Sequence, residues 1–251
     1  MDPLVVKRTV QQIPLLEVVS QKNRYEKVPT IIYYHGWQTS KELALTQGRK
    51  LAKVGFRVLL PDAANHGARK SAISKIPSLT FWESIYHNLF EFELLVNDLH
   101  NRTLLSSIGV GGVSMGGMTT CALLTHHKEI QCGACIMGTP APSLYQQRME
   151  VHPQISAILP TDYSDLLSWV PKYDLAKHPE TLMGRPLLFW HGKKDGKIRF
   201  KDVESFVRDN EQTEEGKQIR FSASASNGHL ITGKVMDEIT GFFMENLKTI
   251  S

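Results

Sequence analysis

The composition of this 251-residue chain is that of an ordinary globular protein, with 41% hydrophobic and 22% charged residues. These fractions exclude the low hydrophobicity and high net charge of a disordered chain. The formal net charge is only +4, and like charges form no long blocks, so the sequence disfavours a nucleic-acid-binding function. No stretch is apolar over the roughly 18 to 20 residues that cross a bilayer, so we expect no membrane span.

The cysteine content and the first residues of the chain indicate a cytoplasmic protein. Three cysteines are an odd number and too few for a disulfide scaffold. An acid and a proline come before any apolar stretch, which is not the pattern of a secretory signal. Cys132 and Cys135 have the spacing of a redox or metal motif, but their segment is typical of a strand, so we interpret them as buried apolar residues and expect no metal site.

Short apolar segments predict strands along the first part of the chain. We expect them at residues 9–13, 15–20, 30–34 and 56–60. Pro14 separates the first two segments and lacks an N–H, which indicates that both strands lie at a sheet edge. The segment 30–34 is apolar throughout, as in a strand buried on both faces of a parallel sheet.

A first amphipathic helix is predicted from Ser40 to Val54. Ser40 is a favoured N-cap residue, and Gly55 is of the type favoured just past a helix end. In this helix we expect Leu43, Leu51 and Val54 to face the core.

A longer helix is predicted to begin at Thr80, because Thr80 and Glu83 have the spacing of a capping box. Apolar residues then recur at steps of three or four, as on one face of a helix. These residues are Phe81, Ile85, Leu89, Phe92, Val96 and Leu99.

The rest of the chain continues the alternation of strands and helices. Strands are predicted at 108–113, 134–137, 187–190 and 219–223, and helices at 116–124, at 203–207 and from Val235 to Leu247. Such alternation predicts an α/β fold in which a mainly parallel sheet is covered by helices on both faces.

The most informative motif is G-x-S-x-G at Gly112, Ser114 and Gly116, between a predicted strand and a predicted helix. A sharp turn there strains the backbone of the serine and leaves room only for glycine two positions to either side. The serine hydroxyl then projects above the sheet at a helix N-terminus. The alternative is a glycine-rich turn without a chemical role, but the strand-turn-helix context favours a nucleophile.

A nucleophilic serine needs a histidine base and an acid that orients it. In enzymes with this motif the acid and then the histidine follow the serine along the chain. Asp195 follows a predicted strand, in a loop at its carboxyl end, where sites on open α/β sheets assemble. His229 is the histidine that follows Asp195. The alternatives are a turn-forming aspartate and an exposed loop histidine.

Acyl transfer also requires N–H donors for the developing oxyanion. The residue after the nucleophile, Met115, supplies one backbone N–H. The second is expected from the loop after the strand at 30–34, where Gly36 lets the backbone turn, and we assign it to Trp37.

These motifs, with the segments 34–37, 61–67, 191–195 and 227–229, together resemble the α/β-hydrolase superfamily. The likeness is greatest to small bacterial carboxylesterases of the YitV and YjfP kind, which are related to dienelactone hydrolases and to the catalytic domain of prolyl oligopeptidases. It extends over nearly the whole chain. Dienelactone hydrolases carry a cysteine nucleophile, so the serine here does not favour lactone opening by their route.

The resemblance implies an eight-stranded, mostly parallel sheet and a triad of Ser114, Asp195 and His229. Such enzymes need neither a cofactor nor a metal. We therefore expect a single domain over residues 1–251 that cleaves small-molecule carboxylic esters through an acyl-enzyme. A thioesterase, acyltransferase or peptidase with the same triad remains an alternative, as does an inactive binding module. The sequence does not indicate the oligomeric state.

The segment 139–185 is longer than a crossover between parallel strands requires. Its aromatic and aliphatic residues, interrupted by prolines, indicate short helices that form a small cap over the site. We expect Tyr145 and Trp169, together with the side chain of Trp37, to bind substrate. The alternative is a surface elaboration that packs on the sheet. Asp62 and His66 could contact substrate too, but bracing of their loop is favoured.

Overall fold

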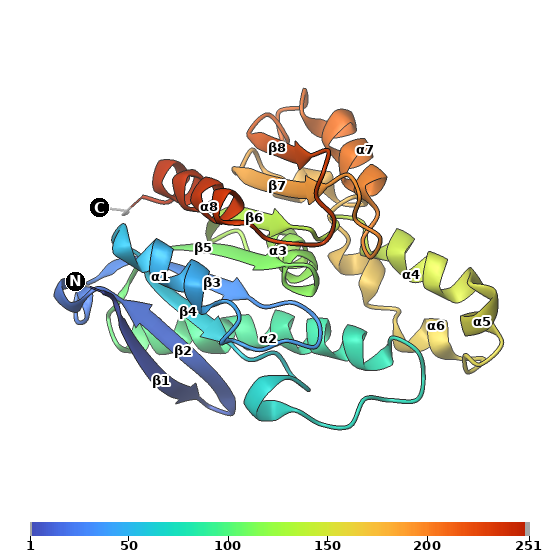
Figure 1. The fold of residues 1–251 in the computed structure, drawn as a ribbon, viewed down its shortest axis with the longest axis horizontal. Helices are drawn as coiled ribbons and strands as arrows, with labels where there is room; N and C mark the ends of the chain where they lie inside the picture. Colours follow the sequence, from blue (N-terminus) through green and yellow to red (C-terminus); the bar gives the residue numbers. More distant parts are fainter. Residues whose placement is uncertain (1, 249–251) are drawn as a thin grey trace.

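The computed structural model describes residues 2–248 and contains one eight-stranded sheet (Figure 1). Its strands lie in the order β1-β2-β4-β3-β5-β6-β7-β8. They are β1 (Leu4–Val10), β2 (Ile13–Val19), β3 (Val28–Tyr34), β4 (Arg57–Pro61), β5 (Leu105–Val113), β6 (Ile130–Ile136), β7 (Leu187–Gly192) and β8 (Ile219–Ser224). The pairs β1·β2 and β2·β4 are antiparallel and the other pairs are parallel. The predicted eight-stranded, mostly parallel sheet is confirmed.

Helices cover both faces of this sheet. They are α1 (Leu45–Lys53), α2 (Leu79–Asn101), α3 (Met115–His126), α4 (Pro142–Val151), α5 (Pro153–Ser156), α6 (Tyr163–Leu166), α7 (Phe200–Asn210) and α8 (Gly233–Asn246), with 3-10 turns at Gln21–Asn23, Gly67–Arg69, Val170–Tyr173 and Pro179–Leu182. One buried cluster packs α2, α3 and α7 on the sheet, and a second packs α1 and α8 on the opposite face. Cys132 and Cys135 are buried in different clusters. No helix in the described part of the chain is long and apolar enough to span a bilayer.

The sequence predicts that the first two strands both lie at a sheet edge, and the structure shows that this is wrong. The first strand ends at Val10, before a turn with positive φ at Gln11. Of these two strands β1 alone lies at an edge, because β2 pairs with β1 on one side and with β4 on the other. Pro14 is accommodated near the start of β2, where it pairs with β1 alone, and its carbonyl accepts a 2.9 Å hydrogen bond from the N–H of Asp62.

Helix α1 begins later than the sequence pattern predicts. The segment 40–44 forms successive turns, because the N–H of Lys41 donates to the carboxylate of Asp62. Leu43 therefore lies outside the helix and is 70% exposed, and Val54 is 41% exposed, so the inward orientation predicted for both is wrong. Leu51 is buried as predicted, and Gly55 ends the helix with a φ of 113°.

Helix α2 shows which part of its sequence pattern is reliable. The six residues of the predicted apolar face, Phe81, Ile85, Leu89, Phe92, Val96 and Leu99, are all buried. The predicted capping box is wrong, because the helix begins one residue earlier, at Leu79, and the hydroxyl of Thr80 accepts a hydrogen bond from the N–H of Ser74 instead.

The segment 139–185 extends beyond one end of the sheet as α4, α5 and α6 before it returns toward β7 (Figure 1). Its buried residues Tyr163, Leu167 and Val170 join a third apolar cluster with Phe81 and Met115. The segment is therefore packed against α2 and the start of α3, next to the residue that follows Ser114.

Candidate active site

Ser114 lies in the sharp turn between β5 and α3. Its backbone is strained, with φ 57° and ψ −113°, and its N–H donates a 2.7 Å hydrogen bond to the carbonyl of Ile136. A Cβ at Gly112 would lie 2.5 Å from the backbone of Gly116, and a Cβ at Gly116 would lie 2.2 Å from the carbonyl oxygen of Tyr34. Both glycines of the motif are therefore required by close backbone contact.

Asp195 and His229 approach each other from two separate loops. Asp195 follows β7 and His229 precedes α8. Nδ1 of His229 lies 2.7 Å from Oδ2 of Asp195, while Oδ1 accepts hydrogen bonds from the N–H groups of Lys197 and Ile198 at 2.8 and 3.0 Å. The carboxylate is thus fixed at both oxygens, and one of them orients the imidazole.

His191 is a fourth partner of this carboxylate, which the sequence does not indicate. Its Nε2 is buried, 3.2 Å from Oδ2 of Asp195 and 2.9 Å from the carbonyl of Ile198. Burial alone would raise the pKa of Asp195, but hydrogen bonds from His191, His229 and two backbone N–H groups hold that pKa well below its ordinary value. The ionised carboxylate accepts a hydrogen bond from the protonated Nδ1 of His229, and Nε2 then carries no proton and can act as a base.

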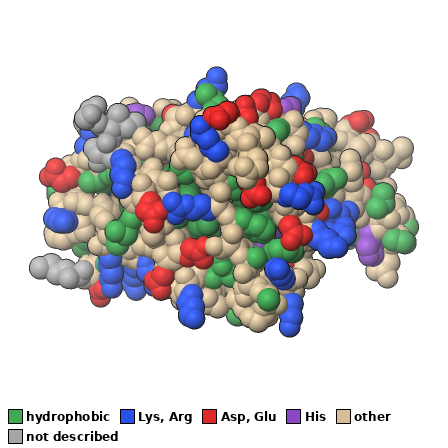
Figure 2. Space-filling view, turned by 90° about the horizontal axis from the view of Figure 1, so that it is seen from above, with side chains coloured by type: hydrophobic (Ala, Val, Ile, Leu, Met, Phe, Trp, Pro, Cys, Tyr) green, Lys and Arg blue, Asp and Glu red, His purple; other side chains and the backbone are tan. Residues whose placement is uncertain are grey.

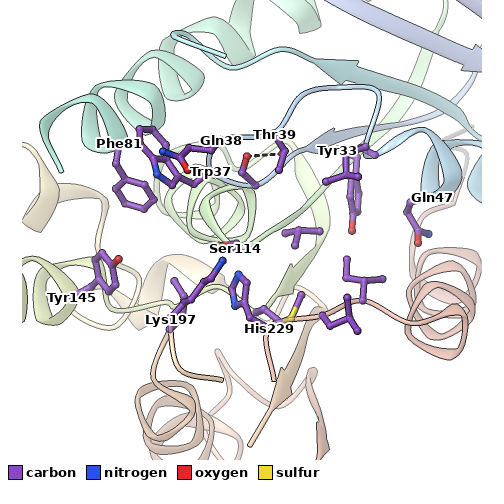
Figure 3. Close-up of a pocket in the computed structure, with 18 of the residues that line it drawn as sticks. Tyr33, Trp37, Gln38, Thr39, Gln47, Phe81, Ser114, Tyr145, Lys197 and His229 are labelled. Carbon is purple, nitrogen blue, oxygen red and sulfur yellow. Dashed lines mark hydrogen bonds between the residues drawn. The ribbon is translucent and has the colours of Figure 1, made fainter. Parts of the chain in front are cut away.

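Ser114 and His229 line one cavity of about 620 Å³ (Figure 3). In Figure 3 these residues lie in its middle, with Trp37, Phe81 and Tyr145 toward one end and Tyr33 and Gln47 toward the other. The structure contains no hydrogen bond from the Ser114 hydroxyl to His229. Catalytic hydrogen bonds of this kind are often long in a free enzyme and shorten when substrate binds.

The two predicted oxyanion donors both lie next to the serine in the structure. Met115 is the first residue of α3, where backbone N–H groups have no partner within the helix. The loop carrying Trp37 lies against the turn, since a Cβ at Gly36 would be 3.6 Å from Cβ of Ser114. Among residues 2–248 no group accepts a hydrogen bond from the Trp37 N–H. Both N–H groups are therefore available to a ligand.

Two histidines brace the loop that carries Trp37. Nε2 of His35 accepts a 3.0 Å hydrogen bond from the N–H of Ala63, and Nε2 of His66 accepts one of equal length from the N–H of Gln38. Each ring also bonds a backbone carbonyl through Nδ1, at 2.8 Å. A ring that accepts at Nε2 must be neutral, and burial lowers the pKa of His35 to about 4 and also lowers that of His66.

Asp62 completes this support. Its carboxylate is fully buried and accepts hydrogen bonds from the N–H groups of Lys41 and Ala68, both at 2.9 Å, and from the Lys41 ammonium at 2.5 Å. The preferred interpretation of Asp62 and His66 as loop-bracing residues is confirmed.

The aromatic residues of the segment 139–185 separate into two groups. Tyr145, on α4, lines the cavity as predicted, and so does the side chain of Trp37. Trp169 is not among the lining residues, so the cavity gives no support to the expectation that it binds substrate. Its ring packs instead against Trp82 and Tyr86, with centroids 6.2 and 5.1 Å apart.

Sequence reasoning also missed several residues that line the cavity. They include Tyr33, Gln47, Phe81, Met149 and Lys197. Phe81 was assigned to the apolar face of α2, and nothing in the sequence separates it from the other core residues of that face.

Comparison with known proteins agrees with this arrangement. A family model described as the alpha/beta hydrolase fold matches residues 29–209. The chain is 33% identical to YitV of Bacillus subtilis (strain 168) over 235 residues, which cover 89% of this chain and 91% of that protein. It is 28% identical to YjfP of Escherichia coli (strain K12) over 247 residues, which cover 96% and 98%. Both proteins carry the word esterase in their names.

Solved structures share the fold at lower sequence identity. TT1662 from Thermus thermophilus matches with a TM-score of 0.80 and 20% identity, over 98% of both chains. Est1E from Butyrivibrio proteoclasticus, a structure with bound ferulic acid, matches with a TM-score of 0.70 and 14% identity, over 97% of this chain and 98% of that one. Since the family model alone spans more than half of the sequence, this chain belongs to the α/β-hydrolase fold family.

Proposed function

We propose that this protein is a serine esterase that cleaves small-molecule carboxylic esters through an acyl-enzyme. Ser114 attacks the ester carbonyl, and Nε2 of His229 takes the serine proton and then gives a proton to the leaving alcohol. Water, activated by the same nitrogen, then releases the acid and restores the serine. Asp195 keeps His229 in the required tautomer and stabilises the imidazolium that forms in each step.

The observation that carries this proposal is the 2.7 Å contact between Asp195 and His229 beside a cavity that both His229 and Ser114 line. Three residues far apart in sequence meet there with the types that nucleophilic catalysis needs. The names of YitV and YjfP support ester hydrolysis as the reaction.

In this proposal the N–H groups of Trp37 and Met115 hold the oxyanion of the tetrahedral intermediate. Fixed donors of this kind are each worth roughly 10²- to 10³-fold in rate. The bracing of the Trp37 loop by His35 and His66 supports the role, because a donor contributes most when it is already in position before the charge develops. The chemistry needs no metal or cofactor.

The cavity accounts for the choice of ester in this proposal. It has two ends with the serine between them, which suits an acyl group on one side and an alcohol on the other (Figure 3). Tyr145 and Trp37 contact the substrate at the end beneath the segment 139–185, which acts as a small cap within a single domain. A cap this small favours short acyl groups of roughly two to six carbons.

Three free cysteines, all buried, support a cytoplasmic enzyme.

Hydrolysis of p-nitrophenyl butyrate by purified variants tests this function. Ser114→Ala should lower kcat/KM by at least about 10³-fold while the protein stays folded by circular dichroism, because the covalent route needs the hydroxyl. The exposed Ser156, on α5, provides a matched control, and Ser156→Ala should retain full activity. A folded Ser114→Ala protein with undiminished turnover would contradict the mechanism.

A further inference from the structure

Lys197 differs in charge from the other residues around the cavity. Among the described lining residues it is the only lysine, arginine, aspartate or glutamate. Its neighbours there include Tyr145, Met149 and Ile198, so the surface around it is largely apolar. In Figure 3 its side chain extends from the loop after β7 into the cavity, with the amine directed toward Ser114 and His229. A cation therefore faces the position where an ester would react.

The backbone of Lys197 is fixed by the proposed catalytic machinery itself. Its N–H donates a 2.8 Å hydrogen bond to Oδ1 of Asp195, and the N–H of Ile198 binds the same oxygen. The side chain is exposed beyond this anchor, but its starting point is set relative to His229. The amine is thus carried on a backbone position that is fixed beside the cavity.

The ammonium of Lys197 has no anionic partner in the described part of the chain. It takes part in none of the ion pairs within residues 2–248, whereas the nearby Lys193 lies over the ring of Phe200, at 5.6 Å from its centroid. The nearest carboxylate along the chain, Asp195, is already held by two histidines and two backbone N–H groups. A positive charge without a counter-ion, directed into an apolar cavity, is complementary to an anionic group of a ligand.

We propose that the esters this enzyme selects carry a carboxylate or similar anionic substituent, and that the Lys197 ammonium binds it. The inference rests on the proposed esterase function and adds the substrate class. A lysine ammonium offers three donors and a compact charge, which suits a single anionic oxygen group. Such an ion pair is stronger inside a partly apolar cavity than at an open surface, because fewer waters compete for either charge.

Two pairs of matched esters test the proposal. In the first pair the charge lies on the alcohol side: para-acetoxybenzoate and the neutral para-acetoxybenzamide. In the second it lies on the acyl side: mono-p-nitrophenyl adipate and its neutral methyl ester. For each pair the measured quantity is the ratio of kcat/KM for the anionic ester to kcat/KM for the neutral one. The two pairs distinguish which part of the ester carries the charge.

Four variants are compared with the unchanged protein. Lys197→Met should lower the ratio in at least one pair by about 5- to 20-fold, the range expected of a partly desolvated ion pair. Lys197→Glu should lower it further by repulsion, and Lys197→Arg should keep most of it. Lys194→Met removes the same charge from the same loop at a residue that does not line the cavity, and its ratios should be unchanged.

The outcomes separate this proposal from the function on which it rests. If the neutral esters are hydrolysed and Lys197→Met leaves both ratios as they were, the anion-binding role is wrong while the esterase function stands. An equal loss for anionic and neutral esters would also overturn it, since the ammonium would then act on the reacting carbonyl. If the unchanged protein hydrolyses p-nitrophenyl butyrate but neither anionic ester, the anion-binding role is wrong and the esterase function stands; if it hydrolyses none of these five esters, the esterase function fails and the inference with it.

Discussion

The loops after β3 and β4 are joined by a reciprocal pair of hydrogen bonds in which His66 accepts the N–H of Gln38. In the opposite direction, His35 accepts the N–H of Ala63, and both bonds are 3.0 Å long. The residue between Gly36 and Gln38 is Trp37, the proposed oxyanion donor. The position of that donor therefore depends on two histidines that must remain uncharged.

This dependence predicts how stability changes with pH. Burial lowers the pKa of His35 to about 4 in the folded protein, against roughly 6.5 in an unfolded chain. At pH values between these two pKa values the unfolded state binds more protons than the folded state, so the free energy of unfolding rises with pH. The contribution of His35 to stability is therefore lost as the pH falls from 6.5 toward 4. Between pH 7 and pH 5 we expect the lowered pKa of His35 to decrease the free energy of unfolding by about 2 kcal/mol.

Urea unfolding at these two pH values measures the effect. In His35→Gln, whose amide oxygen can still accept the Ala63 N–H, the loss between pH 7 and pH 5 should shrink by about that amount. Should this variant fail to fold, the His35 ring can be titrated by NMR in the unchanged protein. A His35 ring that gains its proton near pH 6.5 would contradict the claim that this histidine stays uncharged while it accepts the N–H of Ala63.

Asp195 should matter for hydrolysis of a neutral ester because it orients His229. Asp195→Asn preserves the shape of the side chain but favours the wrong tautomer of the imidazole, so we expect kcat/KM for p-nitrophenyl butyrate to fall by about 10³- to 10⁴-fold. Asp165, an exposed residue of α6, is the matched control, and Asp165→Asn should change kcat/KM by less than about twofold. Equal effects of the two substitutions would rule out Asp195 as the orienting acid.

Gly116 in α3 and Gly241 in α8 should respond to alanine with opposite signs. A Cβ at Gly116 would lie 2.2 Å from the carbonyl oxygen of Tyr34, whereas a Cβ at Gly241, inside α8, meets nothing within 4 Å. We expect Gly116→Ala to lower the free energy of unfolding by about 1 to 3 kcal/mol or more. Gly241→Ala should raise it by about 0.5 to 1 kcal/mol. Thermal or urea unfolding decides the matter, and a stabilised Gly116→Ala protein would disprove the close contact.

Tyr145 and Trp169 should differ in their effect on acyl-chain preference. Tyr145 lines the cavity, and Tyr145→Ala should raise kcat/KM for p-nitrophenyl octanoate relative to butyrate by about 10-fold, since a methylene in an apolar pocket is worth roughly 1 to 3 kcal/mol. Trp169 packs on Trp82 and Tyr86 instead, so Trp169→Ala should leave this ratio unchanged even if it lowers stability. A shift caused by Trp169→Ala alone would place the acyl site elsewhere.

The sequence predicts the centre of the fold better than its edges. The strands of the sheet interior are continuous apolar runs whose burial on both faces leaves one interpretation, and the apolar face of α2 recurs with helical spacing. The starts of α1 and α2 could not be predicted, because they are set by tertiary hydrogen bonds. Lys41 binds Asp62, and Thr80 accepts from Ser74, in place of the local caps that the sequence suggests.

In the candidate site, too, the sequence marks some residues clearly and leaves others without a signal. Ser114 is marked by glycines that its turn requires, and Asp195 and His229 are marked by their order along the chain. Tyr145 and Trp169 could not be told apart from the sequence, because an aromatic residue at helical spacing packs equally well on a neighbouring helix or on a ligand. His191 and Lys197 carry no signal of their own, since each looks like an ordinary residue of a strand end or a turn.

The most direct measurement for the central claim is the mass of the protein after reaction with a fluorophosphonate. An activated serine should form one covalent adduct, and peptide mapping should place it on Ser114. Ser114→Ala and Asp195→Asn should both suppress labelling, the first fully and the second by slowing it. Absence of an adduct on the folded protein, or an adduct on another serine that persists in Ser114→Ala, would contradict the proposed nucleophile.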